Sequence, residues 1–422
     1  SSAQDITAVG AVIKGGYQGL SDGDMTRDVE QYQTIFSTDF DWNDCIRPAK
    51  ASDTTYAQVV YNGIGILDSN RHVYLPPTKT DKWDCAERGF YMLFNQSGKS
   101  DVNYILKFAK PVTLSGVCFY GLNKNKGACL VVDAAAGGTA IDNCLFAYGS
   151  EAYAINASAP IRLIDSRFEN NYTHWVPVVA LASDSVVSNC IFRGNSGSTA
   201  NTGNVLTFGG KGNLVKDCLF ERCNAWVSGG FTKAANICYA SSSGGGSFVD
   251  CVVTNCLSGP GAASVTANHS LFTLLGGGAA TNCTFVGNRT AVYAVANGGY
   301  GLIAALYTGA HTFEASGCLF RDNVVSAMPK TTESCQYVMG VIGNGFNGQS
   351  TVVKNCIFDG NEFEWTVAEG VTPLLSRSAF TLATAANSTS KLTFVNNTVT
   401  GVRQAGAYDI VQLGSGHKQA LA

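Results

Sequence analysis

Two acidic segments have residue types and spacing that could carry chemistry. Asp39 and Asp41 lie two residues apart near the N-terminal end, and Glu362 and Glu364 lie two residues apart near the C-terminal end. Residues two apart on a β-strand point to the same face. Each pair could therefore bind a cation such as Ca²⁺ or act as a general acid and base on a sugar. A turn or a strand end has the same composition, so both pairs are weak candidates for a catalytic site.

Four tryptophan residues could bind sugars by stacking on their rings. Trp42 lies in the first acidic segment, and Trp175, Trp226 and Trp365 lie in excursions between short apolar runs. The same side chains could instead form small apolar clusters within their own segments. The five histidines include no pair at ligand spacing. The sequence therefore predicts no metal site and no cofactor, apart from the Ca²⁺ that the acidic pairs could hold.

The elements that position these residues are defined by a repeated phrase, Asn/Asp-Cys-apolar-Phe-x-x-Asn. Cys and Phe are two apart, so both point into the core and the residue between them points out. The Asn three after Phe falls at a corner, where its side chain can bond the backbone and tolerate a left-handed conformation. The phrase predicts an interior ladder of reduced cysteines, formed by Cys144, Cys190, Cys218, Cys251, Cys283, Cys318 and Cys356.

The spacing of the phrase predicts the architecture. Its Phe positions run from 119 to 394 at intervals of 22 to 38 residues, with short alternating strands and no helical period between them. A strand-rich unit that repeats in this way is typical of a solenoid. We expect an all-β parallel β-helix of about ten to twelve coils, roughly 50–60 Å long. Residues 1–110 would form an N-terminal cap and first coils with a long irregular excursion, and residues 111–422 one continuous solenoid.

Two further cysteine pairs are candidates for disulfides. Cys223 and Cys256 both occupy the Asn position of the phrase in successive repeats. Stacking would place their Cα atoms about 5 Å apart, within the range of a disulfide. Cys45 and Cys85 could close the N-terminal excursion.

The phrase Phe-x-x-Asn resembles the polymorphic outer-membrane-protein repeats of bacterial surface proteins. The opening segment Ile13-Lys14-Gly15-Gly16-Tyr17 is similar to the first coils of secreted bacterial β-helix proteins. The resemblance implies a right-handed parallel β-helix exported from a bacterium, secreted or at the cell surface. The chain opens with Ser1-Ser2-Ala3 and has no initiator Met or apolar segment there, which we interpret as a mature product whose signal peptide is already removed. The companion phrase Gly-Gly-Ala occurs once, at Gly277-Gly278-Ala279, so an autotransported adhesin is not implied. A released or cell-attached relative is consistent with the sequence.

Composition excludes several classes of function. Charged residues make up 14% of the chain and the net charge is −3, so a basic footprint for nucleic acid is absent. No apolar run approaches the 18 residues of a membrane span. The 28 lysine and arginine residues are spread thinly, whereas a groove that binds acidic polysaccharide concentrates such charges on one flank.

Three functions are consistent with these features. The first is a structural or adhesive protein of the extracellular space or cell surface, which could bind a host or neighbouring cell and assemble head to tail into filaments, because a β-helix ends in unpaired strand edges. The second is a polysaccharide lyase or glycoside hydrolase, since right-handed β-helices often house such enzymes. The third is a glycan-binding protein without catalysis. Large interfaces at both ends would favour the first, and a groove lined by the acidic and aromatic candidates would favour the others.

Overall fold

The computed structural model describes residues 4–8, 10–17, 27–29, 31–37, 59–61, 65–67, 73–74, 103–120, 122, 126–147, 149, 152–174, 176–198, 202–227, 235–240, 244–260, 270–293, 302–305, 312–328, 336–339, 341–344, 350–365, 374–381, 391–401 and 409–412.

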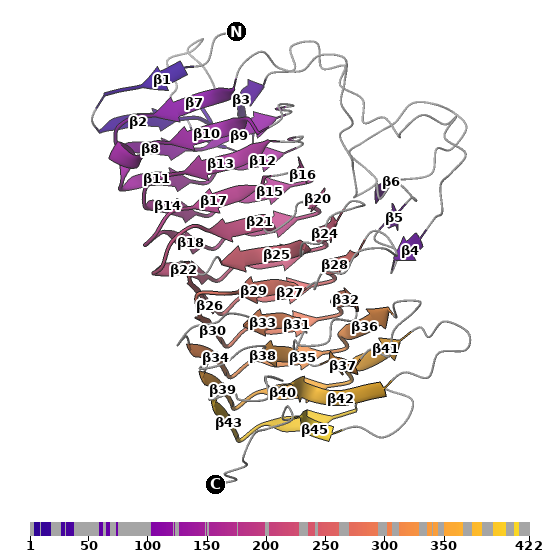
Figure 1. Cartoon of the computed structure of the whole chain (residues 1–422). Helices are drawn as coiled ribbons and strands as arrows, with labels where there is room; N and C mark the ends of the chain where they lie inside the picture. Colours follow the sequence, from indigo (N-terminus) through magenta and orange to yellow (C-terminus); the bar gives the residue numbers. More distant parts are fainter. Residues whose placement is uncertain are drawn as a thin grey trace, which may run out of the picture.

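Four parallel sheets run along a solenoid, and each coil of the chain contributes one strand to the first three (Figure 1). The first sheet contains β1 (Gln4–Ile6), β7 (Tyr104–Phe108), β10 (Ala128–Val132), β13 (Tyr153–Ala157), β17 (Val179–Leu181), β21 (Thr202–Phe208), β25 (Ala235–Ala240), β29 (Phe272–Leu274), β33 (Ile303–Ala305), β38 (Ile342–Asn344) and β42 (Leu374–Thr381), with β37 (Gln336–Met339) and β45 (Asp409–Gln412) paired to β42.

The second sheet contains β2 (Ala11–Lys14), β8 (Val112–Ser115), β11 (Thr139–Asp142), β14 (Ile161–Ile164), β18 (Val186–Ser188), β22 (Asn213–Lys216), β26 (Gly246–Val249), β30 (Gly278–Thr281), β34 (Thr312–Ser316), β39 (Ser350–Lys354) and β43 (Lys391–Val395). The third contains β3 (Thr34–Ser37), β9 (Val117–Tyr120), β12 (Leu145–Ala147), β15 (Arg167–Glu169), β19 (Ile191–Arg193), β23 (Leu219–Glu221), β27 (Val252–Thr254), β31 (Thr284–Val286), β35 (Leu319–Arg321), β40 (Ile357–Asp359) and β44 (Thr398–Thr400).

A fourth, shorter sheet follows the third in the middle coils. It contains β16 (Tyr172–His174), β20 (Ser196–Ser198), β24 (Asn224–Val227), β28 (Leu257–Pro260), β32 (Arg289–Tyr293), β36 (Val324–Met328) and β41 (Glu362–Trp365). A separate antiparallel sheet contains β4 (Val59–Tyr61), β5 (Gly65–Leu67) and β6 (Val73–Tyr74), and Ala134–Ala136 form one 3-10 turn.

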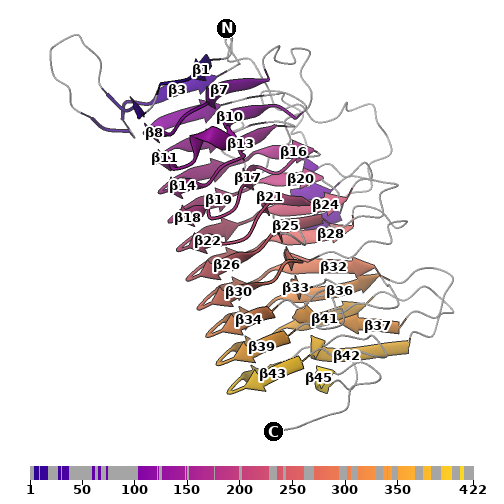
Figure 2. The same cartoon turned by 60° about the vertical axis from the view of Figure 1, so that its left-hand side comes forward.

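The second and third sheets have 11 strands each, so the solenoid has eleven coils among the described residues. This confirms the predicted parallel β-helix and its coil number. The first coil is built from β1, β2 and β3, and the second begins only at β7. The stacked strands form one continuous rod with the two termini at opposite ends (Figures 1 and 2).

Strand register stacks the repeated phrase position on position. Phe146 pairs with Phe168, and Phe168 with Phe192, each one coil further along the rod. Their rings are stacked with centroids 5.0 and 4.8 Å apart. The complete phenylalanine ladder contains Phe36, Phe119, Phe146, Phe168, Phe192, Phe220, Val253, Phe285, Phe320, Phe358 and Val399.

Two ends of this ladder differ from the sequence-based assignment. Phe119 does not begin the series, because Phe36 stacks on it from the first coil. Phe394 is not its last member, since it lies in the second sheet beside Val353. The last coil carries Val399 in the Phe position, and its copy of the phrase is Asn396-Asn397-Thr398-Val399.

The corners of each coil use left-handed residues, as the residue types predict. The position before the cysteine has φ between 48° and 67° and is occupied by Asn143, Asp165, Asn189, Asp217, Asp250, Asn282, Gly317, Asn355 and Asn396. Asn, Asp and Gly tolerate this region best. At the next corner the left-handed residue is the one before the Asn that ends the phrase, such as Asn170 or Asp322, and not that Asn itself. The Asn side chain is instead buried and stacks along the rod.

Candidate functional site

Most of the predicted acidic and aromatic candidates fall where the structure gives no description or where they lie apart. Asp39, Asp41, Trp42 and Trp175, together with Cys45 and Cys85, lie outside the described residues. Trp226 is in β24 and Trp365 is in β41, which are four coils apart in the fourth sheet. Four coils span about 19 Å, so the structure does not bring these two positions together.

Glu362 and Glu364 occupy alternate positions of β41. This segment and Trp226 of β24 belong to strands of the fourth sheet, whereas the sequence predicted that they lie in excursions between strands. Glu362 is half-buried, lies beside Val324 of β36, and its backbone N–H donates to the carbonyl of Asn323 at 2.8 Å. Glu364 lies beside Ser326. Within the described part of the chain no three His, Cys, Asp or Glu side chains are grouped so as to hold a metal ion. The same residues include no helix long and apolar enough to span a bilayer.

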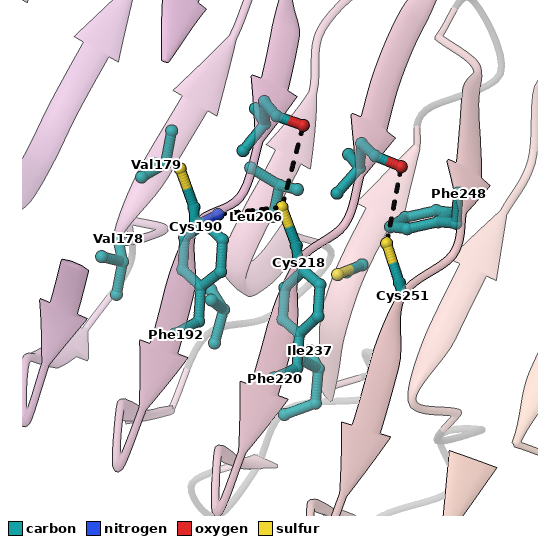
Figure 3. Close-up of a cluster of buried hydrophobic side chains, with 14 of the residues drawn as sticks. Val178, Val179, Cys190, Phe192, Leu206, Cys218, Phe220, Ile237, Phe248 and Cys251 are labelled. Carbon is teal, nitrogen blue, oxygen red and sulfur yellow. Dashed lines mark hydrogen bonds between the residues drawn. The ribbon is translucent and has the colours of Figure 1, made fainter. Parts of the chain in front are cut away.

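The cysteine ladder is present and fully buried. From Cys190 to Cys356 it is continuous over six coils, and Ser166 separates it from Cys144. Figure 3 shows Cys190, Cys218 and Cys251 pointing into the same interior as Phe192 and Phe220. All seven predicted members are at most 2% exposed, and each donates its thiol proton to the carbonyl two residues earlier.

The chemistry of these thiols is that of a packed core. Burial raises the pKa of Cys144 to about 12, and burial likewise raises the pKa of Cys129 to about 12. A buried thiol with a raised pKa is a poor nucleophile, since the thiolate is the reactive species. The described cysteines are all buried, so the ladder thiols pack in the interior of the rod.

The predicted disulfide between Cys223 and Cys256 is not formed, because both are free thiols in the structure. The register prediction was right: the two residues stack one coil apart. In-register parallel neighbours have parallel Cα–Cβ bonds, so their Cβ atoms stay about 4.8 Å apart, wider than the mean of ~3.8 Å in disulfides. The thiols instead donate to the carbonyls of Phe192 and Phe220, at 3.2 and 3.5 Å.

These two cysteines interrupt an interior ladder of asparagines. Asn288 and Asn323 each donate from Nδ2 to the next asparagine's Oδ1, at 3.0 and 2.9 Å. They also donate to the carbonyl of the preceding coil's Phe-position residue, Val253 for Asn288 and Phe285 for Asn323, both at 2.8 Å. The thiols of Cys223 and Cys256 bond the equivalent carbonyls, so they replace asparagine in the same role.

The outer face of the third sheet is the most distinctive exposed surface of the described residues. The residue between Cys and Phe points out in every coil, and over six successive coils it is aliphatic at five positions. We call this set the apolar stripe: Ile191, Leu219, Val252, Thr284, Leu319 and Ile357. Val252 is 40% exposed and Ile357 is 46% exposed, and the other four members of the stripe are half-buried. Contiguous exposed apolar residues are typical of interaction surfaces.

A parallel row of charges lies beside the apolar stripe. We call Arg193, Glu221, Arg321 and Asp359 the charged row; each follows the Phe position by one residue. Nε of Arg193 lies 2.6 Å from the Glu221 carboxylate, and Nε of Arg321 lies 3.1 Å from the Asp359 carboxylate. This face was not among the features predicted from the sequence. The feature that could have indicated it is the aliphatic residue between Cys and Phe in the phrase.

The two ends of the solenoid expose positions that are buried elsewhere. Phe394 and Val399 in the last coil are half-buried, whereas their neighbours Val353 and Phe358 are 1% exposed. In the first coil Ile13 and Phe36 are likewise half-buried above fully buried Leu114 and Phe119. Among the described strands, β2 and β3 pair on one side only, as do β43 and β44.

Comparisons with known proteins give a distant structural likeness. No protein-family model matches the chain, and no curated protein matches it in sequence. Among solved structures it is similar to PfbA, described as a surface protein and adhesin of Streptococcus pneumoniae, with 8% identity over 73% of this chain and 88% of that chain and a TM-score of 0.30. A second PfbA structure covers 71% of this chain and 78% of its own, with 9% identity and a TM-score of 0.23.

Proposed function

We propose that this chain is a structural and adhesive β-helix, secreted by or attached to the surface of a bacterium, whose copies stack end to end into filaments. The observation that carries the proposal is the pair of open ends. Each end leaves core positions half-buried and strand edges unpaired, and such edges are templates for pairing with another chain.

The two ends are complementary because the same ladders run through both. A second copy placed after the last coil would set its Phe36 on Val399 and its Ile13 on Phe394, which continues the two apolar ladders of the rod. All strands would remain parallel. β1 of the second copy would take the place beside β42 that β45 fills within one chain, so stacking requires β45 to leave β42. Contacts of this heterologous kind do not close on themselves and generate an open filament.

A hydrogen bond at the cysteine position of the phrase supports the same alignment of the two stacked copies. Within the rod the N–H of Cys144 donates to Oγ of Ser166, one coil further along. Asn397 holds this position in the last coil and Thr34 holds it in the first. In the stacked filament the N–H of Asn397 would meet the Thr34 hydroxyl of the next copy, which repeats the bond made inside the rod.

Variants that block one end test the proposal. Val399→Lys places a charge at the C-terminal end and Ile13→Lys places one at the N-terminal end, so each variant alone should stay monomeric. Mixed together they should form dimers and nothing longer, because only one productive pair of ends remains. Light scattering and negative-stain microscopy measure this, with filaments of the unaltered chain repeating at about 50 Å per copy.

The matched control is Val186→Lys, a half-buried outward position in β18 of the fifth coil that should assemble as the unaltered chain does. Monomers of the unaltered chain at every concentration would refute end-to-end stacking. So would filaments formed by both end variants. The alternative functions are a polysaccharide lyase or glycoside hydrolase and a glycan-binding protein. They rest on Asp39, Asp41, Trp42 and Trp175, which lie outside the described residues, and on Glu362, Glu364, Trp226 and Trp365 of the fourth sheet.

A further inference from the structure

The outer face of the third sheet has a pattern that is complementary to itself. Along the rod the apolar stripe runs over six coils, and the charged row beside it reads positive, negative, two uncharged, positive, negative. When this order is reversed every charge meets its opposite. We propose that two copies of the chain associate laterally, in antiparallel orientation, through this face.

The geometry follows from one two-fold axis. The axis lies in the interface, runs along the strand direction, and passes between β27 and β31. It places coil on coil in reverse order, so Ile191 of one copy faces Ile357 of the other and Leu219 faces Leu319. Val252 faces Thr284 beside the axis. The stripe therefore packs on the stripe, with the two sheets about 10 Å apart.

The same axis pairs the charged rows. Arg193 of one copy faces Asp359 of the second, and Glu221 faces Arg321 of the second. Each of these four residues already has an opposite charge beside it in its own rod. Association joins two such ion pairs into a four-charge cluster in which every neighbour is opposite. Isologous interfaces of this kind are self-complementary and closed.

The charges also specify the register. A slide by one coil in one direction brings Arg193 opposite Arg321, and a slide in the other direction brings Glu221 opposite Asp359. Like charges juxtaposed across an interface cost several kcal/mol. A parallel arrangement of the rods is disfavoured as well, because a two-fold axis along the rod would place the apolar stripe of one copy on the charged row of the other.

The size of the stripe predicts a weak dimer. Six coils span about 29 Å and a three-residue strand about 10 Å, which gives an interface below the ~800 Å² per partner of a standard stable complex. The association becomes strong when rods are aligned in filaments, since linked contacts raise the effective concentration. The lateral contact uses none of the end residues, so it does not depend on end-to-end stacking.

Cross-linking of two different variants tests the antiparallel register. All proteins carry Val399→Lys to prevent filaments. Leu219→Cys and Leu319→Cys proteins should cross-link with each other through a bismaleimide shorter than the ~14 Å that three coils span. Neither should cross-link with itself, because in the proposed dimer identical positions lie three coils apart. The unaltered cysteines provide the background, and the twelve described ones are buried.

A second measurement uses matched lysine substitutions in the same background. Val252 and Ile35 are both 40% exposed and both occupy the outward position of the phrase, but only Val252 lies in the apolar stripe. Val252→Lys should raise the dimer Kd about a hundredfold in sedimentation velocity, and Ile35→Lys should leave it unchanged. Cross-links within a single variant, or an equal effect of the two lysines, would overturn the proposal. A chain that stays monomeric at millimolar concentration would do so too.

Discussion

Phe272 of β29 fills the space that Val253 of β27 leaves in the phenylalanine ladder. Val253 is the one aliphatic residue between Phe220 and Phe285. The Phe272 ring lies edge-on to both, with centroid distances of 5.9 and 5.4 Å, and it also packs on Phe248 at 4.5 Å. At the seventh coil the core is therefore filled by an aromatic ring from the first sheet, whereas the neighbouring coils fill the same space with a ring from the third sheet.

This exchange predicts a strong interaction between the two sites. Val253→Phe should destabilise the chain by about 1–3 kcal/mol, because two rings would compete for one volume. Phe272→Val should cost a similar or larger amount through the cavity it leaves. The double variant should cost less than the sum by about 1–2 kcal/mol. Urea unfolding followed by circular dichroism measures the cycle, and additive losses would show that Phe272 does not substitute for the missing ring.

The sequence predicted the ladders well because one phrase carries both the inward positions and the corners. Cys190 and Phe192 had to share a face, and Asn189 marked a left-handed corner. The disulfide prediction failed because it used the distance between Cα atoms and left out the direction of the Cα–Cβ bonds. Cys223 and Cys256 satisfied the Cα distance, but parallel Cα–Cβ bonds hold the Cβ atoms too far apart for a disulfide.

Other errors came from residues that imitate the phrase. Phe394 is followed three residues later by Asn397, as Phe358 is by Asn361, yet Asn397 occupies the cysteine position. The positions of Trp226 and Trp365 on separate coils depend on how many residues each coil contains. The spacing of the phrase alone does not show to which sheet each residue of a coil belongs. The apolar stripe corresponds to the outward residue of the phrase, which is aliphatic in five of the six coils.

The asparagine ladder predicts a graded response to substitution at Asn323. Its Nδ2 donates to Phe285 O and Asn361 Oδ1, and its Oδ1 accepts from the backbone N–H and the Nδ2 of Asn288. Asn323→Ala should therefore destabilise the chain by about 2–4 kcal/mol through the loss of these buried hydrogen bonds. Asn323→Cys should cost less, since the thiol of Cys223 makes the equivalent carbonyl bond. Urea unfolding compares the two variants, and hydrogen exchange should report the loss in the neighbouring coils. Equal losses would contradict the role assigned to the side-chain bond.

The buried thiols predict that stability falls as pH rises above about 9. The pKa of Cys129 and that of Cys144 are raised by burial to about 12, so the folded chain keeps these protons at a pH where the unfolded chain releases them. The free energy of unfolding then decreases with pH between about 9 and 12, by at most ~1.4 kcal/mol per pH unit for each thiol. Urea unfolding in the presence of a reductant at several pH values measures this slope.

The double variant Cys129→Ala, Cys144→Ala provides the control for that slope. It lacks the two protons and should lose stability less steeply with pH, whatever its stability at neutral pH. Tyrosine and lysine groups titrate in both proteins and cancel in the comparison. Identical slopes would mean that these thiols titrate normally in the folded chain.

The left-handed corners predict a reversed order of alanine and glycine. Asn282 has φ 53°, a region that costs a residue with a Cβ atom about 1–2 kcal/mol. Asn282→Ala should therefore destabilise the chain by about 1 kcal/mol relative to Asn282→Gly, because glycine adopts this conformation without strain. Ser316, in the strand that leads to the equivalent corner of the next coil, is the matched control. There the backbone is extended, and Ser316→Gly should be the less stable variant by about 0.5–1 kcal/mol. Urea unfolding of the four variants measures both differences. If alanine and glycine had the same order of stability at residues 282 and 316, the left-handed conformation would not determine which residue is favoured at the corner.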